Sequence, residues 1–153
     1  MEAIKLKEIV DAIEDQSDEL YFYLNKKSKK VVMISNDEMR AAEDEDPIED
    51  FPEWQQEIIK IAIEIVNTDD YIELPEKSNI NEYEIMEDFC LSIEDDKLRG
   101  ILLASIKGKG AFKRFKDVAY RHEILENWYE FKNIALKQIA INWCKENNIN
   151  YTD

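Results

Sequence analysis

The segment Gly108-Lys109-Gly110 is the part of the sequence whose residue types best suit chemistry, namely the binding of a phosphate or another anion. Two glycines flank a base, and a helix expected directly after Gly110 would direct its free N-terminal amides at an anion. Lys113 and Arg114 would add positive charge one turn later. These five residues are the candidate contacts for an anion or a nucleic acid.

The same segment has a purely structural interpretation. Gly108 would end one helix in the left-handed conformation, and Gly110 would begin the next. Phe112 and Phe115 are spaced i, i+3, and Ala119 continues the same face, which predicts that both rings are buried. We favour this interpretation because helical spacing of aromatic residues is typical of a core face.

Six acids lie close together in the segment EDEDPIED, residues 43–50. They are Glu43, Asp44, Glu45, Asp46, Glu49 and Asp50. Like charges at this density predict an extended, mobile loop and a candidate surface for a protein partner. The segment lacks the alternating ligand spacing and the glycine of an EF-hand, so we expect no metal site here.

The other residue types that often do chemistry are sparse. His122 is the single histidine and lies near a predicted helix end, which favours a surface or capping role. Cys90 and Cys144 lie on predicted apolar helix faces, where thiols behave as small hydrophobes. They form no C-x-x-C motif or disulfide framework, so we expect a reducing cytoplasm and neither metal nor cofactor. No Walker, dinucleotide-binding or nucleophile-elbow motif occurs.

Charge is distributed unevenly along the 153 residues, which hold 35 acids and 20 bases for a net charge of −15. Residues 1–96 contain 29 of the acids and 9 of the bases, whereas residues 97–153 contain 6 acids and 11 bases. The basic segment 97–121 could bind nucleic acid or fold back on the acidic half of its own chain. We favour the second interpretation, because attraction within one chain neutralises both charges at short range.

Three runs of apolar and aromatic residues predict β-strands. Leu20–Leu24 and Val31–Ile34 flank the polar turn Asn25–Lys30, which is a hairpin pattern. Tyr71–Leu74 precedes Pro75, and a proline at that position predicts a short edge strand. The sequence therefore predicts a small antiparallel sheet of two or three strands.

Helical periodicity begins early in the chain. Residues 6–13 carry apolar groups at i, i+3, i+4 and i+7, and Ser35 is a candidate N-cap for a single helical turn at residues 39–42. Pro52 precedes a helix expected through Val66, with apolar residues on most sides, which predicts a helix central to the core. Trp54 in this helix is expected to be buried.

The remainder of the chain is predicted to be helical. Asn81 caps one helix, a second carries the apolar stripe of residues 98–106, and a third covers residues 111–122. Asn127 is expected to cap a long final helix that buries Trp143. The predicted fold is thus α+β: one helix-rich domain over residues 1–153 with a small antiparallel hairpin sheet.

Several segments resemble a bacterial protein family that has no assigned activity. The segments are GKGAFKRFKD at 108–117, WYEF at 128–131, IAINWC at 139–144, IELPEKSNINEYEIMEDF at 72–89, and the N-terminal hairpin. The resemblance covers most of the chain and implies a small bacterial cytoplasmic protein. It transfers no catalytic residue.

Three functions follow as hypotheses. The first is a non-enzymatic acidic interaction or regulatory module that binds a protein partner. The second is nucleic-acid, nucleotide or anion binding through Lys97–Arg121, which the overall negative charge opposes. The third is an enzyme that uses carboxylates, whose pairs cannot be selected among 35 acids because spacing in a sequence is not distance in a fold. No apolar run approaches the ~18 residues of a membrane span, so we expect no membrane association.

Overall fold

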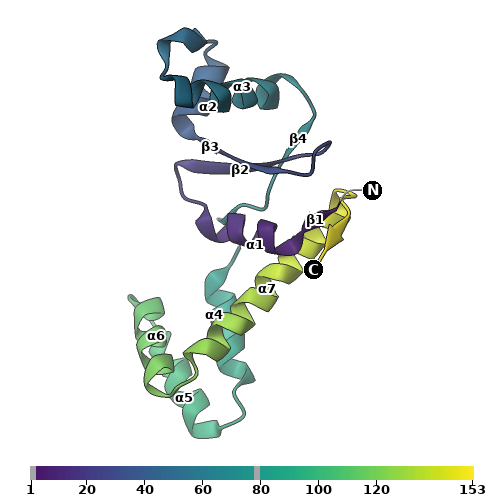
Figure 1. Ribbon diagram of the computed structural model, residues 1–153. Helices are drawn as coiled ribbons and strands as arrows, with labels where there is room; N and C mark the ends of the chain where they lie inside the picture. The colour runs from purple at the N-terminus through teal and green to yellow at the C-terminus, as the bar shows by residue number, and fades with distance from the viewer. Residues whose placement is uncertain (1–2, 78–79) are drawn as a thin grey trace. The chain divides into compact units, whose positions relative to one another are not determined.

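The computed structural model describes residues 3–77 and 80–153, and its contacts divide the chain into two compact units (Figure 1). Unit 1 comprises Met1–Asn79 and Ile139–Asp153, and unit 2 comprises Ile80–Gln138. Ser78 and Asn79, which belong to one segment of the family resemblance, lie outside the described residues. The fold is α+β and helix-rich with a small antiparallel sheet, as the periodicity predicts.

Unit 1 is built on a sheet of strands β2 (Leu20–Asn25), β3 (Val31–Ser35) and β4 (Tyr71–Glu73). The strand order is β3-β2-β4, both pairings are antiparallel, and β4 is an edge strand as expected. The hairpin turn contains no glycine. Instead, the Oδ1 atom of Asn25 accepts hydrogen bonds from the amides of Lys27 and Ser28, and Lys29 takes a positive φ of 60°.

Helices cover both faces of this sheet, with α1 on one side and α2 and α3 on the other (Figure 1). Helix α1 (Leu6–Asp15) buries the apolar stripe that its spacing predicts. On the other side, Ile34 of β3 packs with Ala42 and Ala62, which come from α2 (Asn36–Glu43) and α3 (Glu53–Asn67). The core of unit 1 therefore lies on both sides of a narrow sheet.

Helix α2 is longer than the single turn predicted for residues 39–42. Ser35 and Glu38 form a reciprocal capping box, in which Ser35 Oγ accepts from the Glu38 amide and the Glu38 carboxylate accepts from the Ser35 amide. Because both amides have hydrogen-bond acceptors, the helix begins at Asn36, and Arg40 lies in its last turn. The structure thus confirms the predicted N-cap at Ser35 and corrects the predicted length of the helix.

Residues 43–50 are not the extended loop that their charge predicts. Glu43 ends α2, the amides of Glu45 and Asp46 bond to carbonyls of that helix, and Ile48–Asp50 form the 3-10 helix η1. These local backbone bonds fold the segment tightly despite its charge, because its carboxylates all point into solvent, where water screens them.

The prediction for α3 is wrong in two respects, the extent of its burial and the burial of Trp54. Pro52 precedes the helix as expected, but α3 is buried on one side only, through Ile59 and Ala62. Trp54 is 72% exposed. The reason is its position in the first turn, because the packing of α3 against the core cluster begins at Ile58.

The two ends of the chain meet in a pairing that the sequence does not predict. Strand β1 (Ile4–Lys5) runs parallel to β5 (Tyr151–Thr152). Strands of two residues are too short for an alternating pattern to be visible.

Unit 2 consists of α4 (Glu82–Ser92), α5 (Asp96–Ser105), α6 (Ala111–Arg121) and the first part of α7 (Leu125–Glu146). Its core is aromatic: the ring centroids of Phe89 and Phe115 are 5.9 Å apart, and those of Phe115 and Trp128 are 5.1 Å apart. Edge-to-face packing of this kind adds to the burial of the rings themselves.

One of the two N-caps predicted for unit 2 is confirmed and the other is wrong. Asn81 Oδ1 accepts from the Glu84 amide at 3.0 Å and caps α4, as predicted. Asn127 does not cap α7, because the chain reverses at Glu123, whose φ is 59°, and the helix begins at Leu125. Helix α7 runs continuously from unit 2 into unit 1, so the expectation of a single domain stays a prediction that unfolding can test.

Candidate functional site

The two glycines of the Gly108–Gly110 loop take the conformations that the structural interpretation requires. Gly108 has a φ of +78° and Gly110 a φ of +76°, and Gly110 is the N-cap of α6. A Cβ atom at Gly110 would lie 3.1 Å from the Nη1 atom of Arg114. Glycine is therefore needed at both positions for the turn itself.

The guanidinium group of Arg114 is hydrogen-bonded to main-chain carbonyls of this loop and of the end of α5. Its Nε atom donates to the carbonyl of Ser105 at 3.1 Å, and its terminal nitrogens donate to the carbonyls of Lys107, Gly108 and Lys109. These are carbonyls that the end of α5 and the turn leave without helical partners. Lys109, Lys113 and Arg114 are all exposed, but of these three candidate anion contacts Arg114 is the one whose side chain donates to carbonyls of the loop.

The aromatic residues beside this loop differ in burial. Phe115 and Ala119 are fully buried, but Phe112 is 39% exposed, so the expectation that both rings are buried is wrong for Phe112. Phe112 lies in the first turn of α6, on the edge of the face that Phe115 and Ala119 share. Arg99, another base of this segment, pairs with Asp96 of its own helix.

The acidic surface of unit 1 consists of the six acids at residues 43–50, all of which are exposed. By sequence, unit 1 holds 24 acids and 10 bases, a net charge of −14, whereas unit 2 holds 11 acids and 10 bases. Nearly all of the excess charge therefore belongs to the unit that carries this surface.

Trp54 lies immediately beyond the acidic surface in the chain, separated from Asp50 by three residues. Its exposed fraction of 72% is unusual for the largest apolar side chain. Tryptophan is enriched among the residues that dominate protein interfaces. Its exposure could not be predicted from the sequence, because its position in α3 matches the apolar periodicity.

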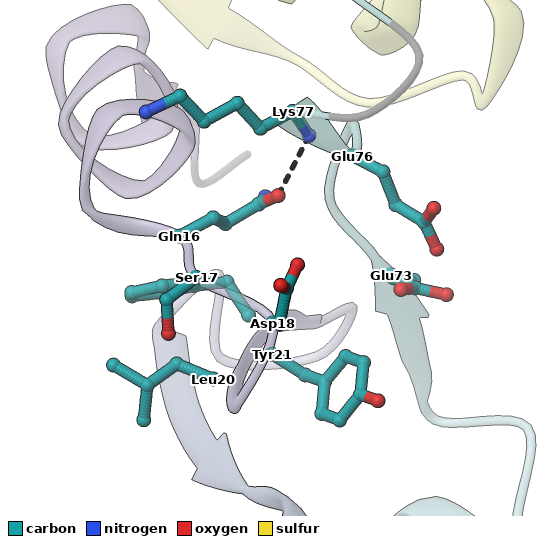
Figure 2. A pocket seen from close by; sticks show the side chains of 9 residues that line it. Gln16, Ser17, Asp18, Leu20, Tyr21, Glu73, Glu76 and Lys77 are labelled. Atoms are coloured by element: carbon teal, nitrogen blue, oxygen red, sulfur yellow. Dashed lines mark hydrogen bonds between the residues drawn. The ribbon is translucent and has the colours of Figure 1, made fainter.

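A cavity of about 560 Å³ in unit 1 is lined by the connection from α1 to β2, the start of β2, the end of β4 and the residues that follow β4 (Figure 2). Its lining residues are Gln16, Ser17, Asp18, Leu20, Tyr21, Phe22, Glu73, Glu76 and Lys77. Gln16 joins the two walls: its Nε2 atom donates to the Pro75 carbonyl at 2.7 Å, and its Oε1 atom accepts from the Lys77 amide at 2.8 Å. Volumes of this order are typical of ligand cavities.

Glu73 and Glu76 both line this cavity, and Glu73 is half-buried whereas Glu76 is exposed. Burial is the largest of three effects that together raise the pKa of Glu73 to about 7; the other two are hydrogen bonding with Glu76 and the negative charge of Glu76. Burial also raises the pKa of Tyr23, with a smaller contribution from the Glu73 charge. Sequence reasoning missed this pair; its only sign was two acids spaced i, i+3 around Leu74-Pro75.

The two cysteines and the single histidine are the remaining candidates for chemistry. Burial raises the pKa of the Cys90 thiol to about 11 and also raises the pKa of Cys144, so both thiols are protonated at neutral pH. His122 is exposed at the C-cap of α6. Over residues 3–77 and 80–153, no group of three or more His, Cys, Asp or Glu side chains is arranged to hold a metal ion.

The fold and its surfaces define a small α+β protein with a strongly acidic unit and a nearly neutral helical unit. The chain belongs to the uncharacterised protein family UPF0158, whose model matches residues 2–153. It is similar to the UPF0158 protein PA5073 of Pseudomonas aeruginosa, with 29% identity over 66 residues, which cover 42% of this chain and 43% of the relative. The match thus spans less than half of that relative. No solved structure matches the chain.

None of the helices in the described part of the chain has both the length and the apolar character needed to cross a membrane.

Proposed function

We propose that this protein is a non-enzymatic interaction module that binds a basic protein partner through unit 1. The observation that carries the proposal is that six exposed acids at residues 43–50 are followed closely in the chain by the exposed ring of Trp54. Charge complementarity steers and orients a partner, while a large aromatic side chain supplies much of the binding energy. We expect the module to act in the cytoplasm, where its two buried thiols stay reduced.

The charge of unit 1 determines the chemistry of the partner. A net charge of −14 in one compact unit repels nucleic acid and attracts a surface rich in lysine and arginine. Trp54 adds a requirement for an apolar or guanidinium group, since arginine stacks on indole rings. The expected partner surface is therefore basic with interspersed apolar residues.

The alternative is anion or nucleic-acid binding by unit 2. It is favoured by the exposure of Lys107, Lys109, Lys113 and Lys116 around the Gly108–Gly110 loop. The internal use of Arg114 weakens it, because the best phosphate-binding side chain of the segment is occupied by carbonyls. An enzyme that uses the carboxylates of Glu73 and Glu76 is a further alternative, because both side chains line the cavity of unit 1.

A labelled amphipathic peptide of lysine, arginine and leucine is the probe for the proposal, with single-stranded RNA of similar length as the competing probe. We expect salt-sensitive binding of the peptide, measured by fluorescence anisotropy, and no binding of the RNA. Neutralising the six acids at residues 43–50 to Asn and Gln should remove the salt dependence. Trp54→Ala should weaken binding by about 2 kcal/mol or more.

A matched control neutralises the same number of exposed acids in unit 2. The control residues are Glu84, Glu87, Asp88, Glu94, Asp117 and Glu130. This control variant changes the net charge by the same amount as the variant at residues 43–50. A difference in peptide binding between the two variants therefore reports on the acidic surface itself and not on the overall charge of the protein. Equal loss of peptide binding in both six-residue variants, or preferential binding of the RNA, would contradict the proposal.

A further inference from the structure

The two edges of the sheet in unit 1 differ in what protects them from pairing with another chain. Strand β2 is central, so β3 and β4 each have one edge that faces away from it. At the edge of β4, Trp143 Nε1 donates to the Glu73 carbonyl at 3.2 Å, and Pro75 follows the strand. Strand β3 has the sequence VVMIS, which contains no charge, proline or glycine. It therefore lacks the residues with which proteins usually prevent pairing at a strand edge.

The register of the hairpin shows which main-chain groups of β3 face this edge. In an antiparallel pair, every second residue of a strand bonds to the neighbouring strand. The Asn25 amide donates to the Lys30 carbonyl at 2.9 Å, so the even-numbered residues of β3 bond to β2. Val31 and Met33 therefore direct their amides and carbonyls away from β2. On that side, no strand in the described part of the chain pairs with β3.

The side chains of the same two residues form an apolar row that is incomplete at the edge. Residues opposite each other in a strand pair point to the same face of a sheet. Val31 is opposite Leu24 and Met33 is opposite Phe22, and both residues of β2 are buried. Met33 is nevertheless 52% exposed. A further strand beside β3 would cover this side chain.

The charges at the two ends of β3 have opposite signs. Lys29 and Lys30 directly precede the strand. At its other end, Asp37 is exposed in the first turn of α2, and exposed Glu19 accepts from the Asn36 amide through its carbonyl. A basic peptide strand would meet like charges at the lysine end. A second copy of β3 running antiparallel instead places the lysine end of each strand beside the acidic end of the other.

We propose that this protein forms a two-fold symmetric dimer in which β3 pairs antiparallel with β3 of a second copy. Val31 of each copy lies opposite Met33 of the other, so that their outward amides and carbonyls bond to one another and both Met33 side chains are covered. Lys29 then lies opposite Ser35 of the second copy, close to Asp37. The net charge of −14 on each unit 1 opposes association, but salt at physiological strength screens it beyond about 8 Å.

Sedimentation velocity of the full chain over a wide range of concentrations, in about 0.15 M salt, tests the dimer. We expect a concentration-dependent monomer–dimer equilibrium. Met33→Pro removes the outward amide without breaking a bond to β2 and should be monomeric at the same concentrations. Met33→Lys, which adds a charge at the edge, is the second variant should Met33→Pro not fold, and it too should be monomeric. Leu91→Lys changes a similarly exposed apolar residue of α4, 56% exposed, and should dimerise like wild type.

A charge exchange between the two ends of β3 tests the antiparallel arrangement. Lys29→Glu and Asp37→Lys should each weaken the variant's own dimer by about tenfold, because both ends of the dimer then join like charges. An equimolar mixture of the two variants should form a heterodimer of nearly wild-type affinity, since each of its ends again joins opposite charges. A mixture no tighter than its components would contradict the proposed arrangement.

Hydrogen exchange locates the interface. Protection of the Met33 amide should rise with protein concentration, whereas the Val32 amide, which bonds to β2, should be protected at every concentration. A monomeric wild type, a dimer unaffected by both Met33 variants, or protection of Met33 by the basic peptide and not by a second copy would each overturn the proposal. The acidic surface at residues 43–50 and Trp54 take no part in this pairing, so the proposed function can fail or hold without it.

Discussion

Trp143 Nε1 donates a hydrogen bond to the main-chain oxygen of Glu73, although the two residues are 70 positions apart in the chain. This bond fastens the last part of α7 to the edge strand β4, and so ties the C-terminal segment of unit 1 to its sheet. Trp143 is half-buried, less than its position on the predicted apolar face implies. Its contribution to stability should therefore come from the indole N–H as well as from the ring.

Replacing Trp143 with Phe keeps most of the apolar contact and removes this donor. We expect the free energy of unfolding to fall by about 1 kcal/mol, since the partly buried carbonyl of Glu73 loses its partner. Trp54→Phe is the matched control and should change stability by less than about 0.5 kcal/mol, because that ring is exposed. Urea unfolding of both variants measures the difference, and equal effects would contradict the role of Trp143.

The Glu73 carboxyl predicts a particular pH dependence of stability. Because its pKa is raised from 4.5 to about 7, the folded state binds more protons than the unfolded state between these values. Its contribution is therefore present in full below about pH 4.5 and is lost as the pH rises through about 7. Between pH 5 and pH 8, wild type should lose stability relative to Glu73→Gln. An opposite trend in urea midpoints would show that Glu73 is not protonated.

Arg114 should matter more to stability than the lysines beside it. Arg114→Gln should lower the free energy of unfolding by about 1–3 kcal/mol, because several carbonyls of the loop lose their charged donor. Lys113→Gln should change it by less than about 0.5 kcal/mol.

Charge reversal in the same loop separates its two interpretations. Reversing Lys109, Lys113 and Arg114 to Glu together should destabilise the protein, whereas reversing only Lys109 and Lys113 should leave it folded. Thermal unfolding of both variants, beside an RNA titration, gives the comparison. Salt-sensitive RNA binding that is lost in a fully stable triple variant would reverse our interpretation of the loop.

The two units should unfold together. Helix α7 is continuous from Leu125 to Glu146. It contributes the buried Trp128 to unit 2 and the buried Cys144 to unit 1, so unfolding of this helix removes core residues from both units. We expect one calorimetric transition whose measured enthalpy equals its van't Hoff enthalpy. Two resolved transitions would show that the chain comprises two domains instead of one.

Local signals in the sequence predict much of this fold. The stripe of α1, the hairpin, the edge strand before Pro75 and the caps at Ser35 and Asn81 all follow from short-range chemistry. The exposure of Trp54 could not be predicted in this way, because periodicity places a residue on a face but does not say how far along the helix the core extends. Pairing of the chain ends in β1 and β5 is equally non-local.

The candidate sites were predictable only in part. The acidic surface is visible in the sequence because its residues are consecutive. The two cavity carboxylates Glu73 and Glu76 are not, because the partial burial of Glu73 sets it apart, and spacing among 35 acids does not reveal burial. Arg114 was correctly placed beside the Gly108–Gly110 loop, but its carbonyl partners depend on the exact turn that the two glycines make.

The most direct test of the central claim is a map of backbone and indole amide shifts in ¹H–¹⁵N spectra during titration with the basic amphipathic peptide. The proposed function predicts that the shifts concentrate at residues 43–54, including the Trp54 indole N–H, and that they disappear at high salt. Shifts confined to residues 107–116, or produced by RNA and not by the peptide, would contradict it.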